Sequence, residues 1–185
     1  LYHPTLLSNN NILCLEEDIE NRLWIGTDKG LNVLLRKTGE IKQIKRIEFI
    51  NNSISALRST RNGKLFIGTD QGLFCYDYNT DSCTLYNRQN TNGIFPETPV
   101  KSLLEDSHGH LWIGTWNQGL FRYDLAKNRF YAYPRMLPKS AHVIFEDSKK
   151  RIWIGTWGSG LYVLENAYDP DNVRWKSFSH ENGNA

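Results

Sequence analysis

The sequence predicts an all-β protein, built as an array of about four four-stranded β-propeller blades. The first observation is a pentapeptide, LWIGT, which occurs four times with small changes, at residues 23–27, 65–69, 111–115 and 152–156. The second is a Gly-Leu pair that follows every copy, at 30–31, 72–73, 119–120 and 160–161. The third is the spacing, because the aromatic residues of the pentapeptide are 42, 46 and 41 residues apart. Self-similarity at this period is typical of propeller blades.

One repeat, in its clearest copy at 98–134, predicts four strands joined by tight turns. Apolar or alternating stretches predict strands at 100–105, 111–115, 120–124 and 129–133. Asp106 and Gly109 are typical of a turn between the first two strands, and Pro134 ends the fourth. The near-continuous apolar run of the pentapeptide indicates a strand that is buried on both faces. The Gly of the pentapeptide would allow a neighbouring blade to approach closely.

The other copies follow the same plan and divide the chain into four blades and a leading segment. We expect the last strand of a preceding blade and a loop in 1–11, then blade one in 12–53, blade two in 54–97, blade three in 98–140 and blade four in 141–185. Leu1-Tyr2-His3 resembles the predicted fourth strand at 85–87, yet the last blade already looks complete. We therefore expect an open segment of a larger propeller, with apolar faces exposed at its two end blades.

The composition excludes several classes of protein. A hydrophobic content of 39% is sufficient for a folded core, and the net charge of +2 gives no basic footprint for nucleic acid. No apolar run approaches the roughly 20 residues that span a membrane. The cysteines Cys14, Cys75 and Cys83 are odd in number and lack a CxxC spacing, so they indicate neither a zinc site nor a disulfide framework. Cys75 and Cys83 could face each other across adjacent strands, but buried free thiols are favoured.

Two groups of residues could suggest catalytic or metal chemistry. The acidic pairs Glu17-Asp18, Glu105-Asp106 and Glu146-Asp147 could act as acid and base. Because they recur before the same turn in three blades, we expect them to be architectural. His108 and His110 could bind a metal, but no third ligand lies nearby in the sequence. No phosphate loop, dinucleotide fingerprint or nucleophile elbow is present. We therefore predict no catalytic residue, no metal and no cofactor.

The repeat unit E-D-x-x-G-x-LWIGT-x-x-x-GL-x-x-Y-D resembles the propeller repeat of bacterial two-component regulators. Residues 105–124 carry it nearly in full, and residues 146–161 carry most of it. Blade two departs furthest, with Phe66 in place of Trp and no Glu-Asp pair. The resemblance covers essentially the whole chain, and its four evenly spaced copies make it specific.

The resemblance implies more than the residues themselves indicate. Such repeats usually form seven-bladed propellers in the periplasmic sensor region of hybrid histidine kinases, and many of those sensors detect oligosaccharides. The chain would then be a non-catalytic piece of a sensor, with an oligosaccharide as its small-molecule ligand. Its other partners would be the remaining blades and domains of a parent protein, which itself forms a homodimer.

The turns that follow the pentapeptide hold the candidate binding residues. Blades one and two have two residues between the Thr and the Gly, whereas blades three and four have three. The candidates for ligand binding are Trp116, Asn117, Gln118, Trp157 and Ser159. In propellers these turns lie on the face that commonly binds ligands, so the two tryptophans would come from equivalent positions on adjacent blades. Indole rings could stack on sugar C–H faces while amides and hydroxyls bind sugar hydroxyls.

Two interpretations of the tryptophans stay open, because each ring could instead pack on the next blade as a structural residue. Tyr133, Arg135 and the loop at 90–99 would join the same face. At the level of function, the alternatives to a sensor are a scaffold that sets dimer geometry while the ligand binds elsewhere, and a propeller lyase or hydrolase. The last would need polar catalytic groups that one blade has and the others lack, and no convincing set is present.

Overall fold

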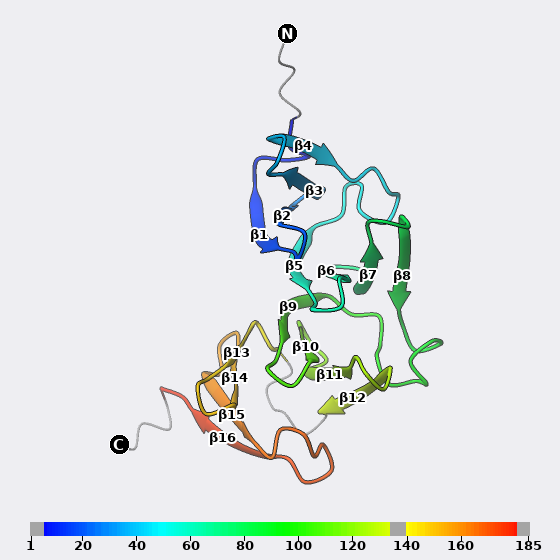
Figure 1. Cartoon of the computed structure of the whole chain (residues 1–185). Coiled ribbons are helices and arrows are strands. Elements are labelled where there is room, and N and C mark those ends of the chain that lie inside the picture. Colours follow the sequence, from blue (N-terminus) through cyan, green and yellow to red (C-terminus); the bar gives the residue numbers. More distant parts are fainter. Residues whose placement is uncertain (1–5, 134–139, 181–185) are drawn as a thin grey trace. The chain divides into compact units, whose positions relative to one another are not determined.

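The computed structural model describes residues 6–133 and 140–180, which form sixteen strands in four antiparallel sheets (Figure 1). The chain makes two compact units, Leu1–Leu85 and Tyr86–Ala185. No helix that is long and apolar enough to cross a bilayer occurs in the described residues. The all-β fold class is confirmed. The strand expected at 1–3 lies outside the described residues.

Each sheet is a four-stranded meander in which strands adjacent in sequence pair with one another. Blade one contains β1 (Ile12–Glu17), β2 (Arg22–Thr27), β3 (Gly30–Leu35) and β4 (Glu40–Gln43). Blade two contains β5 (Ile54–Ser59), β6 (Leu65–Thr69), β7 (Leu73–Asp77) and β8 (Ser82–Tyr86). Blade three contains β9 (Val100–Glu105), β10 (His110–Thr115), β11 (Leu120–Asp124) and β12 (Arg129–Tyr133). Blade four contains β13 (Val143–Glu146), β14 (Ile152–Gly155), β15 (Leu161–Glu165) and β16 (Arg174–Phe178).

The strands predicted for blade three are confirmed, with β10 beginning one residue earlier than expected. The pentapeptide forms the second strand of every blade, and it pairs on one side with the first strand and on the other with the strand that begins at the Gly-Leu pair. Gly109 has a φ of 80°, as expected for the left-handed residue of the turn before β10. Asn21 and Lys150 adopt the same backbone conformation in the equivalent turns of blades one and four.

Within the first unit, β5 of blade two packs on blade one through the Gly of the pentapeptide. A methyl group added to Gly26 would lie 2.9 Å from the carbonyl oxygen of Ile54, so only glycine allows this approach. The thiol of Cys14 donates a hydrogen bond to the same oxygen at 3.3 Å. Trp24, Leu31 and Ile54 are almost completely buried in the core between these two blades.

The second unit repeats this packing between blades three and four. A methyl group on Gly114 would lie 2.5 Å from the carbonyl oxygen of Ala141, to which the Ser102 hydroxyl donates at 3.3 Å. Trp112 and Leu120 are fully buried in the core beside Ala141. The close approach predicted for the pentapeptide glycine therefore occurs in both units.

The three cysteines are free thiols, as expected. Cys75 is buried, while Cys14 and Cys83 are half-buried. Burial raises the pKa of Cys14 and of Cys83 to about 12, so both stay protonated at neutral pH. Protonated thiols are poor nucleophiles and poor metal ligands.

Candidate functional site

Trp116 and Trp157 occupy matching turns of blades three and four. Each turn is closed in the same way: the amide and hydroxyl of Thr115 both donate to the carbonyl of Gly119, and those of Thr156 donate to the carbonyl of Gly160. Both glycines have a positive φ, of 82° and 85°, a conformation that strains other residues. The sequence prediction that the two tryptophans come from equivalent positions is therefore correct in geometry.

The two indole rings meet in one cluster together with a third ring, that of His142. The centroids of Trp116 and Trp157 are 6.3 Å apart. The imidazole of His142 lies 5.1 Å from the Trp116 ring and 5.5 Å from the Trp157 ring. Trp116 is 43% exposed and Trp157 is 71% exposed. We call these three residues the ring cluster.

His142 was not among the site residues predicted from the sequence. This residue directly follows Ala141, which packs on blade three, and its backbone amide donates to the carbonyl of Gly155 at 2.9 Å. The segments that enter each blade share a face with the turns that carry the tryptophans, and His142 is the residue directly before β13. The position of His142 at the entry to blade four was therefore the feature of the sequence that could have placed it near the two tryptophans.

The imidazole of His142 is uncharged at neutral pH. Partial burial, together with the positive charge of Lys101, holds its pKa below the ordinary value of 6.5. Its Nε2 atom is shielded from solvent and has no hydrogen-bond partner among the described residues. The ring cluster thus presents two partly exposed indole rings to solvent, while His142 Nε2 is buried beneath the surface.

The other predicted site residues surround the ring cluster in different ways. The Asn117 side-chain oxygen accepts a hydrogen bond from the Thr98 hydroxyl at 3.0 Å, so it holds the neighbouring loop. Gln118 is exposed in the same turn. Ser159 is half-buried and lines a separate polar hollow of about 490 Å³ with Tyr162 and Ser177. No bound ligand tests these assignments, and they stay predictions.

The loop at 90–99 does lie beside the Trp116 turn. In addition to the contact of Thr98 with Asn117, the Trp116 amide donates to the carbonyl of Pro99 at 3.0 Å. Tyr133 was expected on this face, and that expectation is wrong. Its ring is only 1% exposed and packs on Trp112, and its hydroxyl donates to the Ala167 carbonyl at 2.5 Å. Arg135 lies outside the described residues.

The aspartates of the acidic pairs are architectural, as expected. In blade three, one oxygen of Asp106 accepts hydrogen bonds from the amides of His108 and His110, both at 2.9 Å. The other oxygen accepts from the indole nitrogen of Trp112 at 2.7 Å. Asp18 and Asp147 bind Trp24 and Trp153 in the same manner, at 2.8 Å each. The aspartate therefore ties the turn to the tryptophan of the pentapeptide.

These carboxylates are unsuited to acid–base catalysis near neutral pH. Burial alone would raise the pKa of Asp106, but hydrogen bonds from the His110 amide and the Trp112 indole lower it below the ordinary value. The same balance of burial against hydrogen bonds lowers the pKa of Asp18 and of Asp147. A general acid or base needs a pKa close to the working pH, and these groups are shifted away from it.

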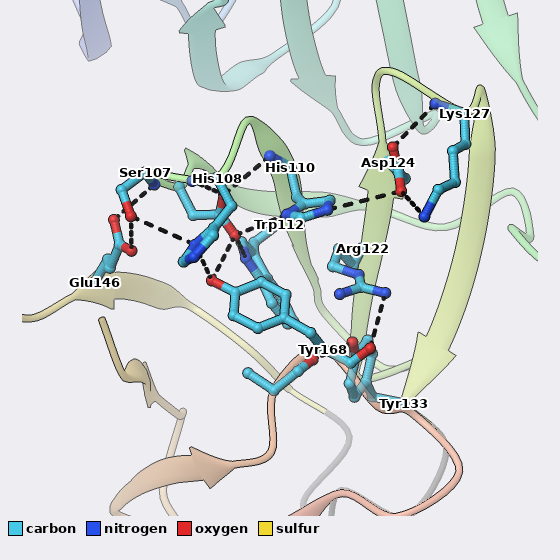
Figure 2. Close-up of polar contacts among 12 residues, drawn as sticks. Ser107, His108, His110, Trp112, Arg122, Asp124, Lys127, Tyr133, Glu146 and Tyr168 are labelled. Atoms are coloured by element: carbon cyan, nitrogen blue, oxygen red, sulfur yellow. Dashed lines mark hydrogen bonds and ion pairs between the residues drawn. The ribbon is translucent and has the colours of Figure 1, made fainter. Parts of the chain in front are cut away.

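His108 and His110 take part in a polar network with Trp112 and Tyr168 (Figure 2), and Asp106 is the acceptor that they share. His110 lies between two carboxylates, with Nδ1 3.4 Å from Asp106 and Nε2 3.7 Å from Asp124. The Tyr168 hydroxyl, from the loop after β15, donates to Asp106 at 3.1 Å and lies 2.9 Å from His108 Nδ1. No group of three or more His, Cys, Asp or Glu side chains in the described residues is placed to hold a metal.

A second link between blades three and four extends this network. Glu146 accepts hydrogen bonds from the amide of Ser107 at 2.8 Å and from its hydroxyl at 2.6 Å (Figure 2). The guanidinium of Arg122 lies over the rings of Tyr131 and Tyr168, 4.6 and 5.4 Å from their centroids. These contacts stabilise the pair of blades that carries the ring cluster.

Comparison with known proteins agrees with this repeat geometry. Three stretches, at 6–29, 94–117 and 136–158, match the family described as two component regulator propeller. The matched stretches lie in or directly before blades one, three and four, which are the copies with an Asp and a Trp in the motif. No curated protein sequence matches the chain significantly.

Several solved structures share the fold. The extracellular domain of a protein described as a hybrid two component system of B. thetaiotaomicron has a TM-score of 0.77 at 22% identity, over 94% of this chain and 25% of that one. PorZ, a surface component of the type-IX secretion system of Porphyromonas gingivalis, has a TM-score of 0.70 at 17% identity, over 92% and 27%. Virginiamycin B lyase from Staphylococcus aureus has a TM-score of 0.69 at 11% identity, over 90% and 55%.

The chain spans only a quarter of the length of the first of these structures. Identities this low support a common fold and no shared activity. The family match rests instead on three separate stretches of sequence, each of which includes a pentapeptide or the strand that pairs with it. The chain is therefore an all-β protein with the fold of a propeller segment, in which three stretches match two component regulator propeller repeats.

Proposed function

We propose that this chain is a non-catalytic, ligand-binding segment of the sensor region of a membrane-bound hybrid two-component system. Its ligand is an oligosaccharide in the periplasm, and the rest of the parent protein passes the signal to a histidine kinase. The family of the repeats supports the sensor role. The extracellular domain among the solved structures of similar fold supports a location outside the cytoplasm.

The observation that carries this proposal is the ring cluster. Two indole rings from adjacent blades, 43% and 71% exposed, lie 6.3 Å apart beside the imidazole of His142. A sugar ring can place its apolar C–H face on an indole, and a neighbouring hydroxyl can bond to the exposed amide of Gln118. Rings that are this exposed suit an extended oligosaccharide better than a small molecule that needs enclosure.

The test is the binding of the chain to an array of oligosaccharides, compared with its Trp116→Ala/Trp157→Ala variant. Removing both rings should cost about 2 kcal/mol of binding free energy, or roughly 30-fold in affinity. The Phe145→Ala variant is the matched control, because Phe145 is also an exposed ring of blade four, at 60%, but lies outside the ring cluster. This control should bind like the unaltered chain.

Two outcomes would decide against the proposal. Equal binding by the double variant and the control would place the ligand away from the ring cluster. An absence of any binding by the unaltered chain would favour the scaffold alternative, in which the blades set the geometry of the parent protein. Thermal unfolding of each variant shows whether the fold survives, since loss of the fold would mean that the tryptophans are structural.

A further inference from the structure

Arg122 is a buried charge at a position that is apolar in the other blades. It lies in the third strand of blade three, β11, where it pairs with Trp112 of β10. The same position, opposite the aromatic residue of the pentapeptide, is held in the other blades by Val33, Cys75 and Val163. Arg122 is only 4% exposed, so it is about as buried as these apolar residues. Blade three therefore carries a guanidinium in the place of an apolar core side chain.

The described residues leave the charge of Arg122 largely without partners. Within that part of the chain Arg122 forms no ion pair, and its one hydrogen bond runs from Nη2 to the carbonyl oxygen of Tyr168 at 3.4 Å (Figure 2). Nε and Nη1 are shielded from solvent and have no hydrogen-bond partner there. The rings around the guanidinium are those of Trp112, Tyr131 and Tyr168, with centroids at 5.8, 4.6 and 5.4 Å. These rings offset part of the cost of burial, but a buried cation ordinarily also has an anionic partner.

A second departure from the repeat covers the same place. The turn between the third and fourth strands has four residues in each of the first three blades but eight in blade four. These turns are 36–39, 78–81, 125–128 and 166–173. The longer loop is tied to blade three by the carbonyl of Tyr168 and by that of Ala167, which accepts from the Tyr133 hydroxyl. Residues 169–172, as far as the structure describes the chain, form hydrogen bonds only within the loop. This part can therefore move without breaking the hydrogen bonds to blade three.

A groove of about 430 Å³ lies beside the buried arginine, within the second unit. It is lined by Tyr131 of β12 and by Pro170 and Asp171 of the longer loop. The ring of Tyr131 belongs to both places, because it lines the groove and also lies over the guanidinium of Arg122. Arg129 lines the groove too, with its guanidinium 5.1 Å from the centroid of the same ring. Asp171 is exposed, so solvent screens its repulsion of an anion. Two guanidiniums thus gather at one ring.

We propose that this groove binds an anionic group, a carboxylate or a sulfate, which Arg122 and Arg129 hold. Hydrogen bonds between a guanidinium and an anion are stronger than those between neutral groups, and Arg122 has donors without partners to offer. Movement of residues 169–172 admits the anion to Arg122. The chemistry fits a free inorganic anion and the acidic group of a saccharide equally. The groove shares no residue with the ring cluster, so this proposal does not depend on the proposed function.

The test is thermal unfolding of the chain with sodium sulfate or sodium glucuronate, at an ionic strength kept constant with sodium chloride. At ten times its Kd, an anion that binds only the folded chain should raise Tm by roughly 3–6 °C. Arg122→Val, which gives this position the side chain found in blades one and four, should abolish the rise. Lys176→Val is the matched control, because Lys176 is a cation 5.2 Å from the ring centroid of Phe178 but is exposed and outside the groove. This control should respond like the unaltered chain.

The two anions distinguish the two sources. A rise with glucuronate alone would support an acidic saccharide, a rise with sulfate alone would support a free inorganic anion, and a rise with both would show that the anionic group is sufficient. No rise with either anion, or an equal rise for Arg122→Val and the unaltered chain, would overturn the proposal. If Arg122→Val does not fold, the Nε–H signal of Arg122 in NMR spectra of the unaltered chain decides. This signal should shift with the anion that raises Tm, and a signal that stays in place would overturn the proposal.

Discussion

A single carboxylate organises the turn between the first two strands in three of the four blades. Asp18, Asp106 and Asp147 each accept two backbone amides on one oxygen and an indole N–H on the other. Blade two has Thr60 in place of the aspartate and Phe66 in place of the tryptophan. The two departures belong together, because a phenyl ring has no N–H that would need the acceptor.

Replacing Asp106 by Ala should destabilise the fold strongly. Its side chain is fully buried, and the change leaves the Trp112 indole and two amides without an acceptor, at a cost of about 3 kcal/mol or more. Urea unfolding of the variant measures this loss. Asp147→Ala is the matched comparison and should lose less, because the Asp147 side chain is 16% exposed. Equal losses would contradict the role assigned to burial.

The charge state of His142 should appear in the pH dependence of stability. The folded-state pKa lies below the ordinary 6.5, so the unfolded chain takes up this proton more readily. The stability that the uncharged His142 imidazole contributes is therefore fully present above pH 6.5, and it is lost as the pH falls through the folded-state pKa. Urea unfolding at several pH values should show a smaller decrease for His142→Phe than for the unaltered chain. Identical decreases would mean that His142 titrates normally.

At the scale of the element, the pentapeptide is a strand whose glycine is needed for the close approach of the next blade and not for the strand itself. Gly114 and Gly155 occupy the same position in β10 and β14, and neither has a positive φ. They differ only in their surroundings, because Gly114 faces Ala141 and Gly155 faces open space within the chain.

Gly114→Ala should therefore destabilise the second unit, whereas Gly155→Ala should leave its stability nearly unchanged. The added methyl on residue 114 would lie 2.5 Å from the Ala141 carbonyl oxygen, and such overpacking costs about 1–3 kcal/mol. Thermal unfolding of the two variants side by side measures the difference. A stable Gly114→Ala variant would show that blades three and four are packed less tightly than described.

At the scale of the whole molecule, the sequence predicted the strands and turns well because their signals are local. Strand alternation, the Asp-to-Gly turn and the repeat period all lie within one blade. The pairing of Trp116 with Trp157 was also predictable, since equivalent turns of adjacent blades must lie on one face. His142 and Tyr133 show the limit of this reasoning. Whether a ring at a strand end points to the ring cluster or into the core depends on packing between blades, which no local pattern records.

The same limit applies to the burial of the Gly-Leu pairs. The sequence indicates that the end blades expose apolar surface, but only the folded chain shows that Leu31 and Leu120 of the Gly-Leu pairs are buried whereas Leu161 is 40% exposed. The function likewise depends on geometry between blades. Each tryptophan alone is compatible with packing, and only the gathering of two exposed indole rings with His142 in one cluster favours a ligand.

The measurement that tests the ring cluster most directly is an NMR titration of the indole N–H signals with an oligosaccharide selected on the array. The chain has six tryptophans, and those at positions 24, 112 and 153 donate their N–H to aspartates. We expect the signals of Trp116 and Trp157 to shift on titration and the three aspartate-bound signals to stay in place. Unchanged Trp116 and Trp157 signals, with shifts elsewhere in the spectrum, would contradict the assignment of the ring cluster as the binding site.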